Sequence, residues 1–185
     1  MSTPPVRVWL LTGPPGIGKS TVVSKVIYLV RSKGYGVGGC LTKEQRKGRE
    51  RTGFTIIDLM SGREGPLASS ESSLGPKVGK YRVNLKGVVE IGATALTEAA
   101  KGAEVIVIDE IGPMELTSPE FKRSAEACFR SGRPILAVVH DKIKDPLIEL
   151  IRALPDKEMI ELTLHNREGL PESLAEQILA LLLPQ

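Results

Sequence analysis

Residues 6–21 read VRVWLLTGPPGIGKST, an apolar run that ends abruptly in a glycine-rich turn. The turn matches the pattern G-x-x-x-x-G-K-[ST], which is typical of loops that bind phosphate groups. Glycine permits backbone conformations that other residues avoid, so successive N–H groups can turn inward and form a nest for phosphate oxygens. The residues expected to bind phosphate are Gly13, Pro14, Pro15, Gly16, Ile17, Gly18, Lys19, Ser20 and Thr21.

Two side chains at the end of this loop supply the chemistry of nucleotide binding. We expect the ammonium group of Lys19 to reach the β- and γ-phosphates and the hydroxyl of Ser20 to bind Mg²⁺. Residues 6–11 predict a buried strand, and apolar residues at helical spacing predict a helix over residues 19–33. A plain turn could spell the same motif by chance, but it would rarely lie between a strand and a helix. The helix would direct the positive end of its dipole at the phosphates.

A second signal follows at residues 104–112, which read EVIVIDEIG. Four apolar residues predict a strand buried on both faces, with two acids at its carboxyl end, where open α/β sheets bind ligands. Asp109 suits the role of holding Mg²⁺, and Glu110 suits that of a general base that deprotonates an attacking water. An apolar run that ends in acids is common by itself. Together with the phosphate loop, the pair favours hydrolysis of a nucleotide.

Basic residues gather at residues 43–51, which read KEQRKGRER. Strand patterns at residues 37–42 and 54–59 flank this stretch and predict a β-hairpin with an exposed basic tip. An arginine brought onto the γ-phosphate accelerates phosphoryl transfer by about 10³ to 10⁵, and Arg51 is the first candidate for that role. A solvated hairpin tip is the alternative, because charged loop tips are common. The further candidates are Arg46 and Arg49.

The middle of the chain contains a flexible stretch and two helix starts. Residues 69–82 are rich in Ser and Gly and predict a mobile loop, either a lid or a plain surface connection. Asn84 is placed to cap a helix over residues 85–101, and Ser118 with the following proline begins another helix. Glu115 lies between these helices and is either a second acidic contact or a structural hydrogen-bonding residue.

Polar residues follow two further predicted strands. A strand over residues 135–139 ends at His140, which either senses the γ-phosphate or is an ordinary loop residue. A last strand over residues 158–164 is followed by Asn166 and Arg167, which would lie near a bound base or ribose. Capping of the final helix is an equal alternative for Asn166.

The composition is that of one globular domain of 185 residues with a formal net charge of +3. That charge is too small to argue for nucleic acid as a partner, and no signal segment or membrane-spanning run is recognisable, so we expect a cytoplasmic protein. Cys40 and Cys128 form no C-x-x-C pair, which predicts reduced core residues. The scarcity of Asn and Gln is a trait of proteins from hot-growing organisms, where a disulfide between the two cysteines is conceivable.

With these residues assembled, the chain closely resembles the small thermophile-type nucleoside-triphosphatase family, whose human member is called the cancer-related nucleoside triphosphatase. The resemblance runs essentially from end to end. The sequence departs from the family pattern at Pro113, where members often carry lysine, and at His140, where several carry threonine. The matching segments are GPPGIGKST at 13–21, RTGF at 51–54, VGKYRV at 78–83, DEIGPMEL at 109–116 and LTLHNRE at 162–168.

The resemblance implies a fold, a reaction and a set of residues. The family has an α/β P-loop fold and hydrolyses ATP, GTP and other nucleoside triphosphates with Mg²⁺ and little base preference. It implies that residues 13–20 and Asp109 form the nucleotide and Mg²⁺ site and that Glu110 is the base. It also implies that Arg51 and Arg167 are functional, without indicating which of them meets the γ-phosphate.

We therefore predict a single P-loop NTPase domain over residues 1–185, with three α/β/α layers, a mainly parallel sheet and an added β-hairpin between residues 37 and 68. It would hydrolyse ATP, GTP, CTP and UTP with Mg²⁺ as a monomer, without a membrane or nucleic acid. A nucleoside or nucleotide kinase is one alternative, but Glu110 argues against it and it needs a lid that excludes water. A nucleotide-binding ATPase stimulated by a protein or RNA partner is another, which the basic hairpin tip permits.

Overall fold

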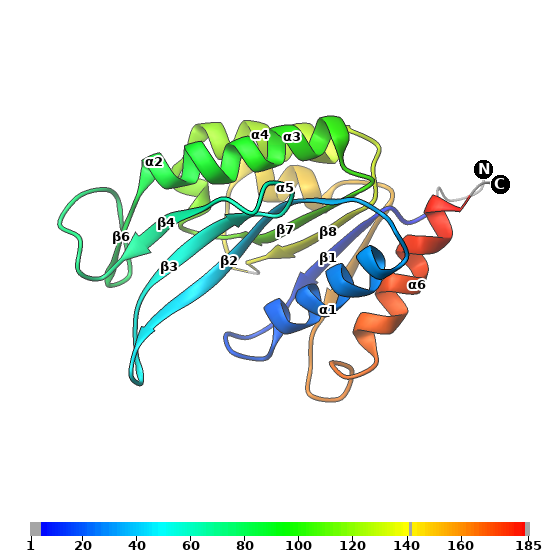
Figure 1. The fold of residues 1–185 in the computed structure, drawn as a ribbon, viewed down its shortest axis with the longest axis horizontal. Helices are drawn as coiled ribbons and strands as arrows, with labels where there is room; N and C mark the ends of the chain where they lie inside the picture. Colours follow the sequence, from blue (N-terminus) through cyan, green and yellow to red (C-terminus); the bar gives the residue numbers. More distant parts are fainter. Residues whose placement is uncertain (1–4, 141, 184–185) are drawn as a thin grey trace.

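The computed structural model describes residues 5–140 and 142–183 and has helices on both faces of a central sheet (Figure 1). The regular elements in chain order are β1 (Val8–Thr12), α1 (Lys19–Ser32), β2 (Val37–Lys47), β3 (Glu50–Asp58), β4 (Glu64–Ser69), β5 (Lys77–Val78), β6 (Tyr81–Val83), α2 (Leu85–Gly87), the π-helix η1 (Val88–Ala93), α3 (Thr94–Gly102), β7 (Val105–Ile111), the 3₁₀ helix η2 (Glu115–Thr117), α4 (Pro119–Arg130), β8 (Ile135–Val139), α5 (Pro146–Arg152), β9 (Lys157–Glu161) and α6 (Leu170–Leu182).

The described strands form one nine-stranded sheet in the order β5-β6-β4-β3-β2-β7-β8-β1-β9. The strands from β2 to β9 in that order are parallel, and β3, β4, β6 and β5 extend the sheet with antiparallel pairs. The predicted three-layer α/β fold with a parallel sheet and an added hairpin is therefore confirmed. The antiparallel extension is larger than one hairpin, because β4, β6 and β5 continue it.

Alternation along the buried strands divides the core into two layers. In β1, Val8 and Leu10 pack on the side of α3, α4 and α5, whereas Trp9 and Leu11 pack on the side of α1 and α6. Because successive side chains of a strand point to opposite faces, a strand covered on both faces must be apolar at every position. The continuous apolar run that leads into the glycine-rich turn follows from this placement.

The helix boundaries predicted near residue 33, at Asn84 and at Ser118 agree with the structure. Gly34, with φ +89°, follows α1, and its N–H donates to the carbonyl of Arg31. The Asn84 side chain accepts a hydrogen bond from the Gly87 N–H at 2.8 Å, and the Ser118 hydroxyl accepts one from the Phe121 N–H at 3.2 Å. Each side chain satisfies a backbone donor that the first helical turn leaves unpaired.

Two predictions about loops need correction. Strand β2 continues to Lys47 and β3 begins at Glu50, so the tip of the hairpin consists only of Gly48 and Arg49 rather than all of residues 43–51. The stretch expected to be a mobile loop contains the short strands β5 and β6. Backbone pairing explains both differences, since a neighbouring strand satisfies backbone groups whatever the side chains are.

Two further findings bear on the expectations from composition. Both cysteines are free and buried, as predicted for reduced core residues, and the Cys128 thiol donates to the carbonyl of Leu96. Burial is the main cause that raises the pKa of the Cys40 thiol well above its ordinary value. Within residues 5–140 and 142–183, no helix has the length and apolar character needed to cross a membrane.

Candidate active site

The glycine-rich loop wraps around the amino group of its own lysine. Gly13, Gly16 and Gly18 all have positive φ angles, of +144°, +77° and +109°, which L side chains rarely adopt. The loop closes so that Lys19 Nζ donates to the carbonyl oxygens of Gly13 at 2.8 Å and Pro14 at 3.1 Å. Because α1 begins at Lys19, the N–H groups of its first turn have no partner within the helix and are available to an anion.

Asp109 is brought next to Ser20, although the two residues are far apart in the sequence. Asp109 is 3 % exposed, and burial raises the pKa of its carboxyl group to about 6. A hydrogen bond with the Ser20 hydroxyl and the charge of Lys19 lower the pKa, whereas the charge of Glu110 raises it further. The predicted pair of Mg²⁺ ligands therefore lies together.

An irregularity in β7 accompanies the two acids. Ile108 pairs with Ala137 and Ile111 pairs with Val139, so β7 contains one more residue than β8 between these pairs. The extra residue interrupts the alternation that would point Asp109 and Glu110 to opposite faces. The peptide bond between the two acids is cis.

Glu110 lies close to a glycine and interacts electrostatically with Lys19 and His140. A Cβ atom added at Gly112 would lie 2.5 Å from Oε1 of Glu110, so the close approach of this carboxylate requires a glycine there. Burial raises the pKa of Glu110, and electrostatic interactions with Lys19 and His140 act in the opposite direction. A carboxyl group whose pKa is raised toward neutrality is a better proton acceptor than an exposed one.

Glu115 is a buried acid of the segment that follows Glu110. It is 2 % exposed, and burial raises its pKa to about 8, with the charges of Glu110 and Asp109 adding to the shift. Hydrogen bonds from the backbone N–H groups of Glu115 and Gly112 act in the opposite direction. These contacts are within its own loop and support the structural alternative for this residue.

Unpartnered buried polar atoms gather at the same edge of the sheet. In the described part of the chain, the buried side-chain nitrogen or oxygen atoms without a hydrogen-bond partner are Thr12 Oγ1, Thr42 Oγ1, Asp109 Oδ2 and His140 Nδ1. Thr12 ends β1, His140 follows β8, and Thr42 comes directly after Leu41, which pairs with Asp109. Leaving such a group unpaired costs about 1 to 3 kcal/mol, so this edge is suited to a polar ligand.

The two threonines were not identified from the sequence. Thr12 is the last residue of the strand before the phosphate loop, and a polar residue that ends an apolar strand is a signal that could have drawn attention to it. Thr42 has no such signal, because the next residues continue β2.

Arg51 is held within the antiparallel extension of the sheet. Its Nε donates to the Tyr81 hydroxyl at 2.9 Å, its Nη1 donates to the Glu44 carboxylate at 2.7 Å, and the guanidinium lies 5.2 Å from the centre of the Phe54 ring. Ile56 pairs with Thr42 at the site, and Arg51 lies five residues away along β3, or roughly 16 Å at the usual rise of a strand. The role predicted for Arg51 in catalysis stays a prediction.

The segment after β9 is shaped by Asn166. Its side chain accepts from the Thr163 N–H at 2.8 Å and donates to the Glu161 carbonyl at 2.9 Å. Helix α6 begins at Leu170, with Gly169 at the N-cap position, so the expectation that Asn166 caps the final helix is wrong. Arg167 is exposed, and its backbone N–H donates to the Thr163 carbonyl. The contacts of Asn166 and Arg167 with a base or ribose stay predictions.

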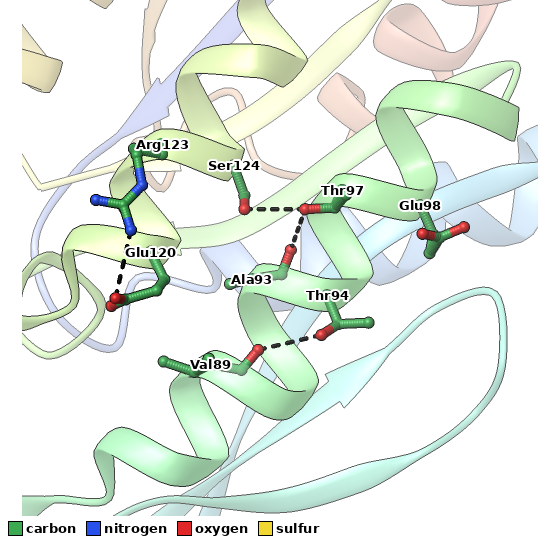
Figure 2. Close-up of a pocket in the computed structure, with 8 residues that line it drawn as sticks. All are labelled: Val89, Ala93, Thr94, Thr97, Glu98, Glu120, Arg123 and Ser124. Atoms are coloured by element: carbon green, nitrogen blue, oxygen red, sulfur yellow. Dashed lines mark hydrogen bonds and ion pairs between the residues drawn. The ribbon is translucent and has the colours of Figure 1, made fainter.

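A surface hollow of about 440 Å³ lies away from the phosphate loop and the two acids, between η1, α3 and α4 (Figure 2). Its polar side chains largely bond within the protein: Thr97 contacts Ser124 and Arg123 pairs with Glu120. None of the predicted site residues lines it. The residues around it are Val89, Ala93, Thr94, Thr97, Glu98, Glu120, Arg123 and Ser124.

Comparison with known proteins gives one consistent result. The sequence pattern of the NTPase family matches residues 8–175. The chain is 43 % identical over 174 residues to "Nucleoside-triphosphatase THEP1" of Thermofilum pendens, covering 94 % of this chain and 96 % of that protein. It is 43 % identical over 168 residues to the protein of the same name from Methanosarcina barkeri, covering 90 % of this chain and 94 % of that protein.

Solved structures agree with this relationship over nearly the whole chain. The crystal structure of THEP1 from Aquifex aeolicus superposes with a TM-score of 0.79 at 33 % identity, covering 96 % of this chain and 99 % of that one. The solution structure of a human cancer-related nucleoside triphosphatase superposes with a TM-score of 0.80 at 32 % identity, covering 95 % and 98 %. The chain therefore belongs to the nucleoside-triphosphatase family of THEP1, a family of hydrolases.

Proposed function

We propose that this enzyme cleaves the γ-phosphate of ATP, GTP, CTP and UTP with Mg²⁺ and with little preference for the base. One observation carries the proposal: the lysine of the phosphate loop, the buried Asp109, the half-buried Glu110 and the unpartnered polar atoms all lie at the carboxyl edge of the parallel strands. Ligands of open α/β sheets bind at that edge.

The residues of the site fit a magnesium ion. Asp109 offers a buried carboxylate oxygen without a protein partner, and the Ser20 hydroxyl adjoins the same carboxylate. The described residues contain no group of three or more His, Cys, Asp or Glu side chains that could hold a metal ion by themselves. A site in which phosphate oxygens supply part of the coordination needs fewer protein ligands. When bound, Mg²⁺ would neutralise charge on the β- and γ-phosphate oxygens.

The protein's own groups would position the triphosphate and the water. The loop N–H groups and Lys19 would hold the β- and γ-phosphates, while Glu110 accepts a proton from a water placed in line with the bond to be broken. The water oxygen bonds to the γ-phosphorus as the bond between that phosphorus and the bridging oxygen breaks. The products are a nucleoside diphosphate and inorganic phosphate, and the proton on Glu110 returns to solvent.

The aromatic side chains support weak base selectivity. Trp9, Phe121, Phe129 and Tyr81 are buried, and Phe54 packs edge to face on Tyr81 with ring centres 5.1 Å apart. Stacking on an aromatic ring is an energetically strong way to hold a base, and few rings are free to do it. Contacts of Asn166 and Arg167 with the base or ribose belong to the proposal.

The proposal also includes a second positively charged side chain, besides Lys19, that contacts the γ-phosphate. Arg51 would supply it only by leaving Glu44 and Tyr81, which requires the β2–β3 hairpin to move toward the phosphate loop. Arg167 is the other candidate and has no such bonds among the described residues.

The test is phosphate release from each of the four triphosphates with Mg²⁺, by the native protein and by Glu110→Gln. We expect release from all four without an acceptor, and a loss of about 10² or more in kcat for Glu110→Gln, because the variant lacks the general base. The matched control is Glu176→Gln, which removes an exposed carboxylate on α6 and should retain native activity.

The same assay includes the alternatives. Transfer of phosphate to an added nucleoside or monophosphate would identify a kinase. Release that occurs only after addition of RNA or a protein partner would identify a stimulated ATPase. Either result would contradict independent hydrolysis, and the mass of the protein in solution tests the expected monomer.

A further inference from the structure

The segment after β9 lies beside the phosphate loop. Strand β9 is the neighbour of β1 in the sheet, and Glu161 at its end pairs with Thr12 at the end of β1. The Leu162 N–H then donates to the Thr12 carbonyl at 2.8 Å. A Cβ atom added at Gly13 would lie 2.9 Å from the Leu162 carbonyl oxygen, so the two segments are in close contact there. Figure 1 shows the loop before α1 and the segment before α6 at the same edge of the sheet.

The order of the strands indicates which part of a nucleotide is directed toward this segment. The acids Asp109 and Glu110 lie on β7, the phosphate loop follows β1, and β9 lies on the side of β1 away from β7. In the proposed function the terminal phosphate faces the acids, and the loop N–H groups hold the phosphate next to it. Because a nucleotide runs from its phosphates through the sugar to the base, its other end extends past β1 along the carboxyl edge of the sheet. The base is thus directed toward the segment after β9.

The side chain of Asn166 stabilises this segment. Its oxygen accepts a hydrogen bond from the Thr163 N–H at 2.8 Å, and its nitrogen donates one to the Glu161 carbonyl at 2.9 Å. The Arg167 N–H donates to the Thr163 carbonyl at 3.2 Å. These bonds close a turn that contains Leu164. A group that is fixed in place before a ligand binds loses less conformational freedom when it makes its contact.

Leu164 presents an apolar side chain from this turn. The residue is 65 % exposed and belongs to neither layer of the core. Single exposed apolar side chains are common on protein surfaces and need no explanation by themselves. The position of Leu164 is what distinguishes it, because the turn that carries it is held by hydrogen bonds, adjoins the phosphate loop and lies in the direction of the base.

We propose that the side chain of Leu164 packs against the face of the nucleotide base and lets the site accept all four bases. This inference rests on the proposed function and states how the same site binds the base. An aliphatic side chain has no hydrogen-bond donor or acceptor, so it cannot distinguish bases by hydrogen bonding. It nevertheless removes apolar surface of any base from water, which favours binding. Loss of most of a leucine side chain from such a contact weakens binding by about 5-fold or more.

The experiment measures, by calorimetric titration with Mg²⁺, the binding of ADP, GDP, CDP, UDP and ribose 5-diphosphate, which has the same sugar and phosphates without a base. Leu164→Ala truncates the side chain, and Leu164→Met retains an apolar side chain of similar volume. Leu74→Ala is the matched control, because Leu74 is 80 % exposed and precedes β5 in the antiparallel extension of the sheet. Urea unfolding verifies that each variant is folded, which truncation of an exposed side chain should leave unchanged.

We expect Leu164→Ala to weaken the binding of each nucleoside diphosphate by about 5-fold or more and that of ribose 5-diphosphate by less than about 2-fold. Leu164→Met and Leu74→Ala should bind all five ligands as the native protein does. An equal loss for ribose 5-diphosphate would assign the contact to the sugar, and a loss restricted to one base would make it selective. Either result, or unchanged binding of the nucleoside diphosphates, would overturn the inference.

Failure of the proposed function is recognised separately, because binding of diphosphates requires no hydrolysis. Phosphate release from the four triphosphates tests the reaction, whereas the comparison of nucleoside diphosphates with ribose 5-diphosphate tests only the contact with the base.

Discussion

At the scale of single residues, Glu115 links the chemistry of the site to the pH dependence of folding. Its pKa is about 8 in the folded protein and about 4.5 in an unfolded chain, so between these values the folded state binds the extra proton. The resulting stability is fully present below about pH 4.5 and is lost as pH rises through about 8. Asp109 and Glu110, whose pKa values are also raised, contribute in the same direction.

The substitution Glu115→Gln should remove the largest part of this dependence, because the amide fills the same space and does not ionise. In EDTA, we expect the free energy of unfolding of the native protein to fall between about pH 5 and pH 8, by at most about 1.4 kcal/mol per pH unit from this group. The variant should show a flatter dependence. Urea unfolding at several pH values measures both slopes.

The control for this comparison is Glu176→Gln, whose exposed carboxylate should leave the native slope unchanged. Identical slopes for the native protein and Glu115→Gln would show that Glu115 is ionised in the folded state and would contradict the pKa given above.

At the scale of elements, the pairing of β2 with β7 determines where Thr42 and Asp109 meet, and a glycine permits it. Gly39 in β2 has φ +108° and pairs with Val107, and a Cβ atom added there would lie 1.9 Å from the Val107 carbonyl oxygen. Real Cβ atoms do not approach so closely, so the backbone of one strand would have to shift.

Gly39→Ala should therefore destabilise the protein by about 3 kcal/mol or more, through both the forbidden φ and the backbone clash. Gly169→Ala is the control: its φ is −93°, and a Cβ atom there meets no atom within 4 Å, so a change of at most about 1 kcal/mol is expected. Urea unfolding compares the two variants. Equal stabilities would mean that β2 and β7 separate without cost at Gly39.

At the scale of the whole molecule, the site exists only when distant segments fold together. Ser20 begins α1 and Asp109 lies in β7, so an unfolded chain cannot present them jointly to a metal and a nucleotide. Mg²⁺ with ADP at 100 times the dissociation constant should raise the free energy of unfolding by about 2.7 kcal/mol.

The substitution Asp109→Asn should abolish the part of this stabilisation that depends on Mg²⁺, and EDTA should have the same effect on the native protein, because both remove the metal. Thermal unfolding with and without the ligands measures it, with Glu176→Gln as the control that keeps the full gain. A gain in Asp109→Asn as large as that of the native protein would exclude Asp109 as a metal ligand.

Much of the fold was predictable from the sequence because its signals are local. The apolar run before the glycine-rich turn, the helix that begins at Lys19, and the caps at Asn84 and Ser118 each depend on residues within a few positions of one another. The same holds for the expectation that Asp109 and Glu110 end a buried strand. Patterns of this length determine which element forms and where it begins.

The tertiary structure alone decided which distant groups meet. Insertion of β8 between β1 and β7 brings His140 to the same edge of the sheet as the phosphate loop and the acids, and the pairing of β2 with β7 brings Thr42 close to Asp109. Likewise, Arg51 gains Glu44 and Tyr81 as partners only because β2, β3 and β6 share one sheet. Strand order and burial arise from packing of helices against both faces of the sheet, a balance over the whole chain that no short stretch of sequence contains.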